Sequence, residues 1–311
     1  MFGGSINISD FDVELQKAGG ESNAFTSNDI TNYYDVIPAQ NIETALWLES
    51  DRMLSLAFTK KSLEVQRNVV IEEFKQRYLN QPYGDVWLEL RPLVYETHPY
   101  KWATIGKDIA HIENATIHDV KSFFKKHYVP SNAILCVSGN FDQESIRTKI
   151  EKYFGDIPKV IKPERHIPKE PKQLDFKTKS IYRDVPANAF YYAFRMPARN
   201  HPYYYLGDLM SDAIGKDSSS ILNISLKKEL DLVSEINAFI TGSIDDGLFV
   251  ISGKLSEKVG FEKFDEELWL QLDKIIEKGI DSNKLNALKN KISTAKAFQD
   301  QGLLNRSINL S

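Results

Sequence analysis

A short motif that occurs twice constrains this chain more than any other feature. Asn-Ala-Phe stands at 23–25 and again at 237–239, each time at the start of a predicted β-hairpin. Each hairpin is followed by a long amphipathic helix, and the dipeptide at 67–68 aligns with that at 289–290. A repeat of this kind indicates a duplicated structural unit. The sequence therefore predicts an α+β fold of two homologous domains, each a mostly antiparallel sheet covered by helices.

Chain length and a change in composition indicate where the two domains meet. With 311 residues the chain is long enough for two hydrophobic cores. The stretch DIPKVIKPERHIPKEPKQLD at 156–175 is rich in Pro and Lys and poor in apolar residues, which is typical of a linker. We expect a first domain over 1–155, a linker over 156–175 and a second domain over 176–311.

The two copies differ in length at their outer ends. About sixty residues precede the motif in the second copy and only about twenty in the first, so roughly forty are expected to be missing from the front. The second copy also stops short of a counterpart to the strand and helix that close the first, at 133–137 and 142–154. We therefore expect a fold that is truncated at both ends.

Hydrophobic periodicity and turn signals predict the individual elements. Helices are expected over 10–18, 41–56, 60–80, 83–95, 117–127, 142–154, 203–214, 218–229, 261–278 and 282–300. Strands are expected over 23–27, 31–37, 133–137, 177–185, 188–196, 232–241 and 247–254, with 133–137 buried.

The predicted helix over 60–80 carries an acidic pair, Glu72-Glu73, beside its apolar stripe. A glutamate that flanks such a stripe is usually a solvated surface residue. On the alignment of the two copies, however, Glu73 corresponds to Ala295, so the fold can form without this carboxylate. The comparison favours a role for Glu73 that is specific to the first copy.

Composition excludes several classes of function. Apolar residues make up 42% and charged residues 26%, as in an ordinary soluble globular protein. A net charge of -4 argues against a nucleic-acid or anionic-membrane partner. No segment approaches the roughly 18 consecutive apolar residues of a membrane span. Cys136 is the only cysteine, which excludes an internal disulfide and makes the cytoplasm the default location.

Five stretches of the chain carry a family resemblance. They are MFGGS at 1–5, GGESNAFTSNDITNYY at 19–34, LESDRM at 48–53, QRNVVIEEF at 66–74 and FFKKHYVPSNAILCVSGNF at 123–141. Together they resemble the pitrilysin/insulinase family of zinc metallopeptidases, in its bacterial branch related to mitochondrial processing peptidase. The resemblance covers nearly the whole chain and implies a half-clamshell that acts on extended or unfolded peptides.

The resemblance implies a zinc site of which this chain holds one ligand. In the family, zinc is bound by an inverted motif, His-x-x-Glu-His, and by a glutamate from a second helix. Glu73 matches that glutamate, whereas both histidines and the general-base Glu would lie upstream of Met1. A catalytic zinc needs three protein ligands. We therefore expect a zinc metalloendopeptidase as the parent protein, and a chain that alone binds zinc weakly or not at all and is inactive.

The resemblance also implies a peptide-binding strand. In the family a peptide adds to an exposed edge strand that the segment 23–27 resembles, so that affinity comes from backbone hydrogen bonds. On this basis Asn23, Ala24 and Phe25 are candidate substrate-binding residues. Because the same motif recurs at 237–239, where no zinc site is expected, the alternative that it serves only the hairpin stays open.

One departure from the family bears on partners. Family members often carry a Tyr, preceded by an Arg, where Ser234 stands here. In two-subunit members the zinc-bearing half lacks this pair and a partner half supplies it. The resemblance thus implies a second pitrilysin-like half, which is fused to this one, separate, or a second copy. The competing hypothesis is a non-catalytic subunit that binds peptide or scaffolds a partner, although the retained Glu73 argues against it.

Overall fold

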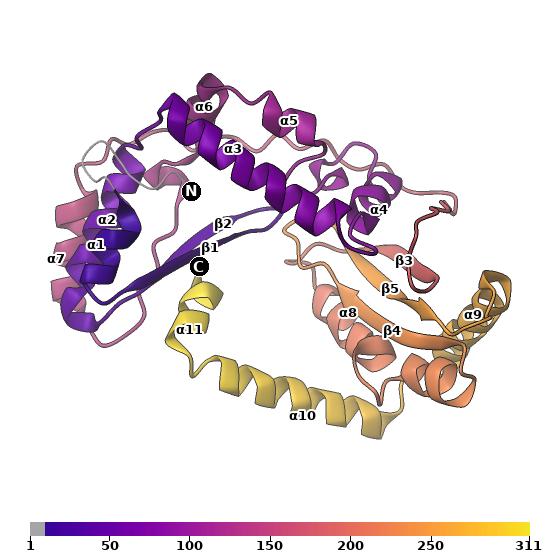
Figure 1. The fold of residues 1–311 in the computed structure, drawn as a ribbon. Helices are drawn as coiled ribbons and strands as arrows, with labels where there is room; N and C mark the ends of the chain where they lie inside the picture. Colours follow the sequence, from indigo (N-terminus) through magenta and orange to yellow (C-terminus); the bar gives the residue numbers. More distant parts are fainter. Residues whose placement is uncertain (1–9) are drawn as a thin grey trace. The chain divides into compact units, whose positions relative to one another are not determined.

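The computed structural model describes residues 10–311, which form two compact units (Figure 1). The first unit comprises the chain up to Asn80, Thr97–Pro171 and Phe298–Ser311, and the second comprises Gln81–Glu96 and Lys172–Ala297. The segment 81–96 therefore groups with the second unit although it precedes the predicted linker. The domain boundaries drawn from the sequence stay a prediction, and the stretch MFGGS at 1–5 lies outside the described residues.

The first unit is built from one β-hairpin and several helices. Its two antiparallel strands are β1 (Glu21–Thr26) and β2 (Thr31–Val36). Its α-helices are α1 (Phe11–Lys17), α2 (Ile42–Leu54), α3 (Lys60–Phe74), α5 (Ile109–Glu113), α6 (Ile117–His127), α7 (Gln143–Phe154) and α11 (Leu303–Leu310). Shorter turns are η1 (Ala39–Asn41), η2 (Lys75–Leu79), η3 (Pro99–Lys101) and η4 (Pro130–Asn132).

A buried cluster supports the base of this hairpin. Leu15, Ala45 and Leu48 pack together, and Phe11 and Ile37 lie against them. The cluster joins α1 to α2, while α1 also contacts β1 and α2 also contacts α7 (Figure 1). Burying these apolar side chains holds the hairpin to the helices at its open end.

Two glycines allow the turn from α1 into β1. Gly19 has a φ of 74°, a left-handed conformation that favours glycine. A Cβ on Gly20 would lie 2.9 Å from the side chain of Leu15. The pair at 19–20 is therefore required by the close approach of the hairpin to α1.

The second unit is built around a three-stranded antiparallel sheet in the order β3-β5-β4. Its strands are β3 (Ala189–Met196), β4 (Val233–Ile240) and β5 (Gly247–Leu255). Its helices are α4 (Val86–Val94), α8 (Tyr204–Ser211), α9 (Phe261–Lys278), most of α10 (Ser282–Gln299) and the π-helical turns η5 (Asp212–Lys216) and η6 (Asn223–Glu229).

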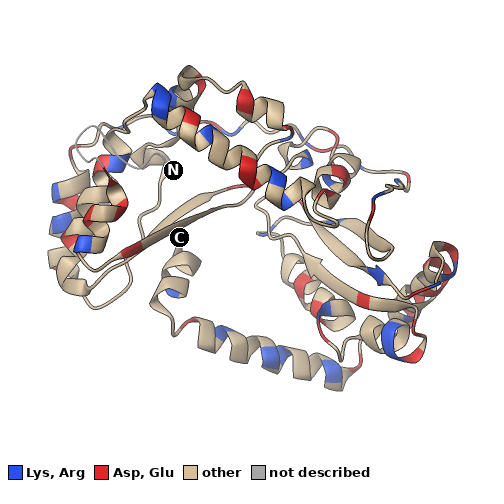
Figure 2. Cartoon of the chain, in the orientation of Figure 1, with Lys and Arg blue, Asp and Glu red and all other residues tan. Residues whose placement is uncertain are grey.

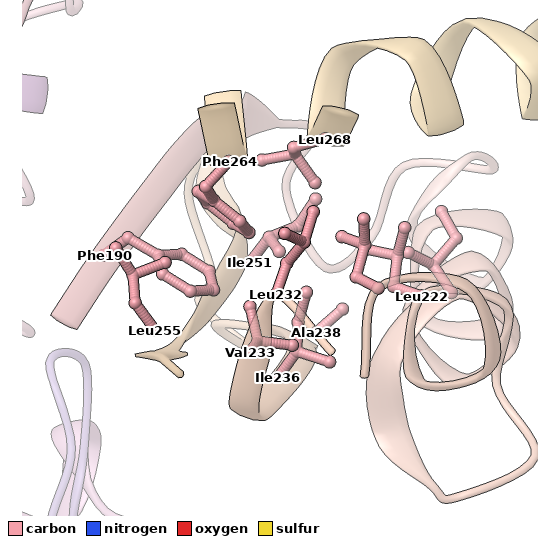
Figure 3. Packing of buried hydrophobic residues seen from close by; sticks show 12 residues of the cluster. Phe190, Leu222, Leu232, Val233, Ile236, Ala238, Ile251, Leu255, Phe264 and Leu268 are labelled. Atoms are coloured by element: carbon pink, nitrogen blue, oxygen red, sulfur yellow. The ribbon is translucent and has the colours of Figure 1, made fainter. Parts of the chain in front are cut away.

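One face of this sheet forms the larger core (Figure 3). Phe190 from β3 packs on Phe264 from α9 with ring centroids 4.1 Å apart, and Ile251 from β5 lies beside them. Leu222 and Leu226 from the segment around η6 complete the cluster and are fully buried. Alternate side chains of the strands point to this face of the sheet and pack against the apolar face of α9, as expected for a sheet covered by helices.

The opposite face of the sheet is covered by the segment 81–96. Trp87 of α4 packs edge-on against Phe239 of β4, with ring centroids 6.2 Å apart. Arg195 of β3 donates a hydrogen bond to the Val94 carbonyl at 2.5 Å. A segment that precedes the predicted linker therefore completes the second unit.

Helix α10 is basic along its length and is tied to a loop of the second unit. It carries four lysines and no acidic residue (Figure 2). Lys284 donates to the Ser219 carbonyl at 2.8 Å, and Lys291 pairs with Asp217 at 2.7 Å. The hydrogen bond from Lys291 holds the pKa of the Asp217 carboxyl below its usual range.

Most predicted elements form, but two predicted strands do not. Within the described residues, 133–137 and 177–185 are irregular and pair with no strand, so both predictions were wrong. Ile134 is 73% and Leu135 48% exposed, whereas a buried strand was expected. A strand needs a neighbour for its backbone groups, and an apolar run alone does not provide one.

The helices predicted over 203–214 and 218–229 form in part as the π-helical turns η5 and η6. No helix in the described part of the chain has the length and apolar content needed to cross a bilayer.

Candidate functional site

Helix α3, which carries Glu73, is defined at both ends. Thr59 and Ser62 form a capping box, in which the Ser62 N–H donates to Thr59 Oγ1 at 3.0 Å. After Phe74 the helix widens into the π-helical turn η2 (Lys75–Leu79), a conformation that often occurs near functional sites. The helix predicted over 60–80 is thus continuous through 79 and places Glu73 next to the change in helical pitch.

Glu73 lies at the end of an exposed stripe of α3. Val65 and Val69 precede it by two turns and one turn, and they are 52% and 55% exposed. The Glu73 side chain is itself 41% exposed, and its Oε1 lies 3.0 Å from Nη2 of Arg77. The carboxylate is therefore accessible and held by a surface ion pair, while the neighbouring Phe74 is buried.

Arg67 anchors another side of α3. Its guanidinium donates to the Ala115 carbonyl at 2.6 Å and to the Ile112 carbonyl at 3.3 Å. Helix α3 accordingly packs on α5. These contacts fix the helix that presents Glu73 without covering the stripe that ends in it.

The side chains of residues 10–311 do not make a complete zinc site. In this range no three His, Cys, Asp or Glu side chains converge in a way that could hold a metal ion. Glu73 is engaged with Arg77, and His98 is buried, with its Nδ1 accepting from the Tyr100 N–H at 3.1 Å. A single carboxylate does not satisfy the donor set of a catalytic zinc, so no step through the metal follows from these residues.

The candidate peptide-binding residues Asn23, Ala24 and Phe25 lie in the middle of β1. The hairpin has two strands, so among the described residues β1 pairs with β2 on one side and with no strand on the other. Phe25 is 39% exposed. An edge with unpaired backbone groups is a template for a further strand.

The phase of the hairpin hydrogen bonds decides which groups face outward. The Ser27 N–H donates to the Ile30 carbonyl at 2.8 Å, so alternation along the antiparallel pair turns the backbone groups of Ala24 away from β2. The Ala24 N–H is occupied by Oδ1 of Asn23 at 2.8 Å. A peptide that pairs with β1 would have to replace this contact with one of its own carbonyls.

The second Asn-Ala-Phe motif has a different environment. Asn237, Ala238 and Phe239 also lie in the first strand of a hairpin, with Ala238 opposite Ile251. Ala238 is 1% exposed, and a Cβ on Gly215 would lie 2.6 Å from its side chain. The motif occupies the same place in both hairpins, but in the second unit η5 packs closely on it.

Two carboxyl groups lie at the open end of the β1–β2 hairpin, and the sequence analysis did not single them out. Asp35 on β2 and Glu49 on α2 share a hydrogen bond. Burial raises the pKa of the Asp35 carboxyl above its usual range and the pKa of Glu49 to about 7. The Arg52 guanidinium lies 3.3 Å from Glu49 and over the ring of Tyr33. Its positive charge offsets part of the rise in the pKa of both carboxyls. The stretch LESDRM, which contains Glu49, was the only signal in the sequence.

Ser234, the departure from the family pattern, lies on β4. The strand has an irregular register between Val233 and Glu235, and Ser234 is exposed there. Its Oγ donates to the Lys254 carbonyl at 3.4 Å. The side chain thus contributes a weak contact within the sheet.

Comparison with protein families agrees with this geometry. Residues 1–90 match the family described as insulinase (peptidase family M16), and residues 114–292 match the peptidase M16 inactive domain. The chain therefore belongs to peptidase family M16, and the resemblance to the pitrilysin/insulinase family is confirmed.

Individual relatives are longer than this chain. The zinc protease PqqE of Helicobacter pylori is 29% identical over 290 residues, which cover 92% of this chain and 65% of that protein. The β subunit of the mitochondrial-processing peptidase of Saccharomyces cerevisiae is 25% identical over 252 residues, which cover 76% and 54%. The chain thus spans less than two thirds of either relative.

Solved structures share the fold. A protease from Helicobacter pylori superposes with a TM-score of 0.89 at 27% identity, covering 98% of this chain and 75% of that one. The peptidase M16 inactive domain from Pseudomonas fluorescens superposes with a TM-score of 0.82 at 18% identity, covering 94% and 71%. The predicted α+β fold, with antiparallel sheets and covering helices, is confirmed.

Proposed function

We propose that this chain is the peptide-binding part of a zinc-dependent M16 peptidase that acts on extended or unfolded peptides. The observation that carries the proposal is the open edge of β1, where the Ala24 N–H faces away from β2. Relatives of this chain are named zinc proteases, which supports zinc chemistry in the complete protein. In this proposal Glu73 is the zinc ligand that the chain contributes.

The residues of the chain would bind and orient the peptide. An extended peptide would pair with β1, replace Asn23 Oδ1 at the Ala24 N–H and lie with alternate side chains on each face of the hairpin. Recognition through the backbone accepts many sequences, as an oligopeptidase requires. Zinc held by three protein ligands would supply a bound water with a pKa lowered to about 7.

We further propose that residues 1–311 alone bind peptides without cleaving them, and that catalysis requires a further segment and a second M16 half. The incomplete donor set around Glu73 supports this view. The direct test incubates the purified, zinc-loaded chain with a fluorescein-labelled unfolded peptide. Anisotropy reports binding, and mass spectrometry reports cleavage.

Two results of this test would count against the proposal. Cleavage that a chelator abolishes would contradict the inactivity of the chain. Absence of binding would contradict the role of β1. A chain with Ser27→Pro in the hairpin turn serves as the control for specific binding, because proline removes the N–H that donates to the Ile30 carbonyl.

A second candidate is a non-catalytic M16 subunit that binds peptide or scaffolds a partner half. The match of residues 114–292 to the inactive domain of the family and the ion pair between Glu73 and Arg77 favour it. The DNA upstream of the Met1 codon separates the two candidates. An in-frame His-x-x-Glu-His motif there supports the peptidase, and its absence supports the non-catalytic subunit.

A further inference from the structure

The turn of the β1–β2 hairpin is tied to two other segments of the first unit through Asp29. The Asp29 side chain is only 8% exposed although it lies in a turn. It accepts a hydrogen bond from the Tyr100 hydroxyl at 2.5 Å and one from Nη2 of Arg165 at 3.3 Å. A carboxylate with so little exposure needs such partners, so the two donors fix where the turn lies.

Hydrogen bonds within the turn connect Asp29 to the ends of the two strands. Ser27 Oγ accepts hydrogen bonds from the N–H groups of Asp29 and Ile30, each at 3.2 Å. Serine side chains that bond to the backbone two and three residues ahead rigidify turns. Asp29 therefore cannot shift without moving the ends of β1 and β2.

Glu170 fixes the loop that supplies the Tyr100 hydroxyl. Its Oε2 accepts from the N–H groups of Thr97 and His98 at 3.0 and 2.7 Å. The buried His98 in turn accepts from the Tyr100 N–H through Nδ1. The tyrosine is thus held from its backbone as well as from its hydroxyl.

Arg165 and Glu170 come from one short piece of the segment predicted to be a linker, 156–175. One binds the hairpin turn and the other binds the loop at 97–100, which itself binds the turn. The three pieces close a ring of polar contacts. This part of the segment is therefore anchored to the first unit.

A hairpin of two strands is marginally stable without outside contacts. The Tyr33 hydroxyl on β2 shares a hydrogen bond of 2.6 Å with the Tyr128 hydroxyl, and the ring around Asp29 holds the turn. These supports attach to β2 and to the turn, and among residues 10–311 no strand pairs with the outer edge of β1.

We propose that Asp29, together with Arg165 and Tyr100, is a positioning residue that presents the edge of β1 to a peptide. The segment around 165–170 then acts as a strap on the peptide-binding hairpin, in addition to joining the two halves of the sequence. The inference rests on the proposed function, since it concerns the affinity of β1 for an extended peptide. Preorganisation of a binding strand raises affinity because less freedom is lost on binding.

The test uses the full chain, the labelled unfolded peptide and the variant Arg165→Gln. Arg165 is 46% exposed, so the variant should fold. Loss of a partly exposed ion pair should weaken peptide binding by about fivefold. Arg165→Lys, which keeps the charge, should bind within about twofold of the wild type. Backbone amide exchange in 21–26 should be faster in Arg165→Gln and restored in Arg165→Lys.

Asp217→Asn is the matched control. It removes a carboxylate that pairs with a surface lysine in the second unit, Lys291 at 2.7 Å, and should leave peptide affinity unchanged. If the wild type binds the peptide, and Arg165→Gln binds it with equal affinity and shows unchanged amide exchange in 21–26, only the inference about Asp29 and Arg165 is overturned. An equal loss in Asp217→Asn would overturn it as well, because the effect would then be general. No binding by the wild type would overturn the proposed function and the inference together.

Discussion

At the scale of single residues, the structure separates groups that act through their own chemistry from groups that only hold others. Glu73 is accessible and lightly paired, as a residue that can exchange partners must be. Asp35 and Glu49 are instead partly buried at the open end of the hairpin and share a hydrogen bond. Glu73 is a candidate zinc ligand, whereas Asp35 and Glu49 affect how the stability of the chain depends on pH.

Glu49→Gln should make the stability of the first unit less dependent on pH. Burial raises the pKa of Glu49 from 4.5 to about 7, so the folded chain binds more protons than the unfolded chain between these values. Stability should therefore fall as pH rises from about 5 to 7 in the wild type and change less in Glu49→Gln. Thermal melts from pH 5 to 8 measure this, with Asp10→Asn as the control, an exposed cap on α1. Identical profiles for wild type and Glu49→Gln would contradict the pKa assignment.

The contacts of Asp29 show why parts of the candidate site could not be predicted from the sequence. Its partners Tyr100 and Arg165 are 71 and 136 positions away along the chain. No periodicity or motif connects residues at such separations. The position of Glu73 on a helix, by contrast, follows from local spacing, and its role was suggested by the family resemblance.

At the scale of elements, the strands of the hairpin differ in what each backbone group does. The N–H of Ala24 points away from β2. Because the direction of the backbone groups alternates along the strand, the N–H of its neighbour Phe25 points toward β2. The two positions are adjacent and lie in the same strand. They can therefore be used to separate peptide binding from folding.

Ala24→Pro should weaken peptide binding while the chain still folds. Proline removes an N–H that β2 does not use, and proline is tolerated on the outer side of an edge strand. Loss of one backbone hydrogen bond to the peptide should lower affinity by about fivefold. Anisotropy titrations and thermal melts together measure the effect.

Phe25→Pro is the matched variant. It should destabilise the chain by about 1 to 2 kcal/mol because it removes a hydrogen bond within the hairpin. If Ala24→Pro destabilised the chain as much as Phe25→Pro, the register deduced for the outer edge would be wrong.

The elements themselves were predictable where local pattern and tertiary environment agree. The amphipathic faces of α3 and α9 and the apolar β-branched and aromatic residues of β4 and β5 carry clear signals. The segments 133–137 and 177–185 have the composition of strands but no partner in the described residues. Composition indicates what a segment can form, and pairing depends on the neighbours that the rest of the molecule provides.

At the scale of the whole molecule, the two units are interleaved along the sequence. The segment 81–96 belongs to the second unit, although it precedes the predicted linker at 156–175. Trp87 and Val94 place it on the sheet of that unit. Cutting the chain at the linker would therefore divide the second unit.

Residues 176–311 expressed alone should be poorly folded. Without α4, the sheet face that carries Phe239 would be exposed to water, and binding of a hydrophobic dye should rise. A peptide of residues 81–96 added in excess should reduce the dye signal and raise the melting temperature, because it binds only the folded sheet. The same peptide with Trp87→Ala is the control. A stably folded 176–311 with no response to either peptide would contradict this view of α4.

The interleaving also sets an order of events during synthesis. The chain passes from one unit to the other at 80/81, 96/97, 171/172 and 297/298. On the ribosome α4 emerges long before β3, β4 and β5 exist to receive it, because the segment 97–171 of the first unit is synthesised in between. The second unit can close only when its last strands have left the exit tunnel. A chaperone contact in that interval would protect the apolar side of α4, whereas slow codons after residue 96 would prolong its exposure.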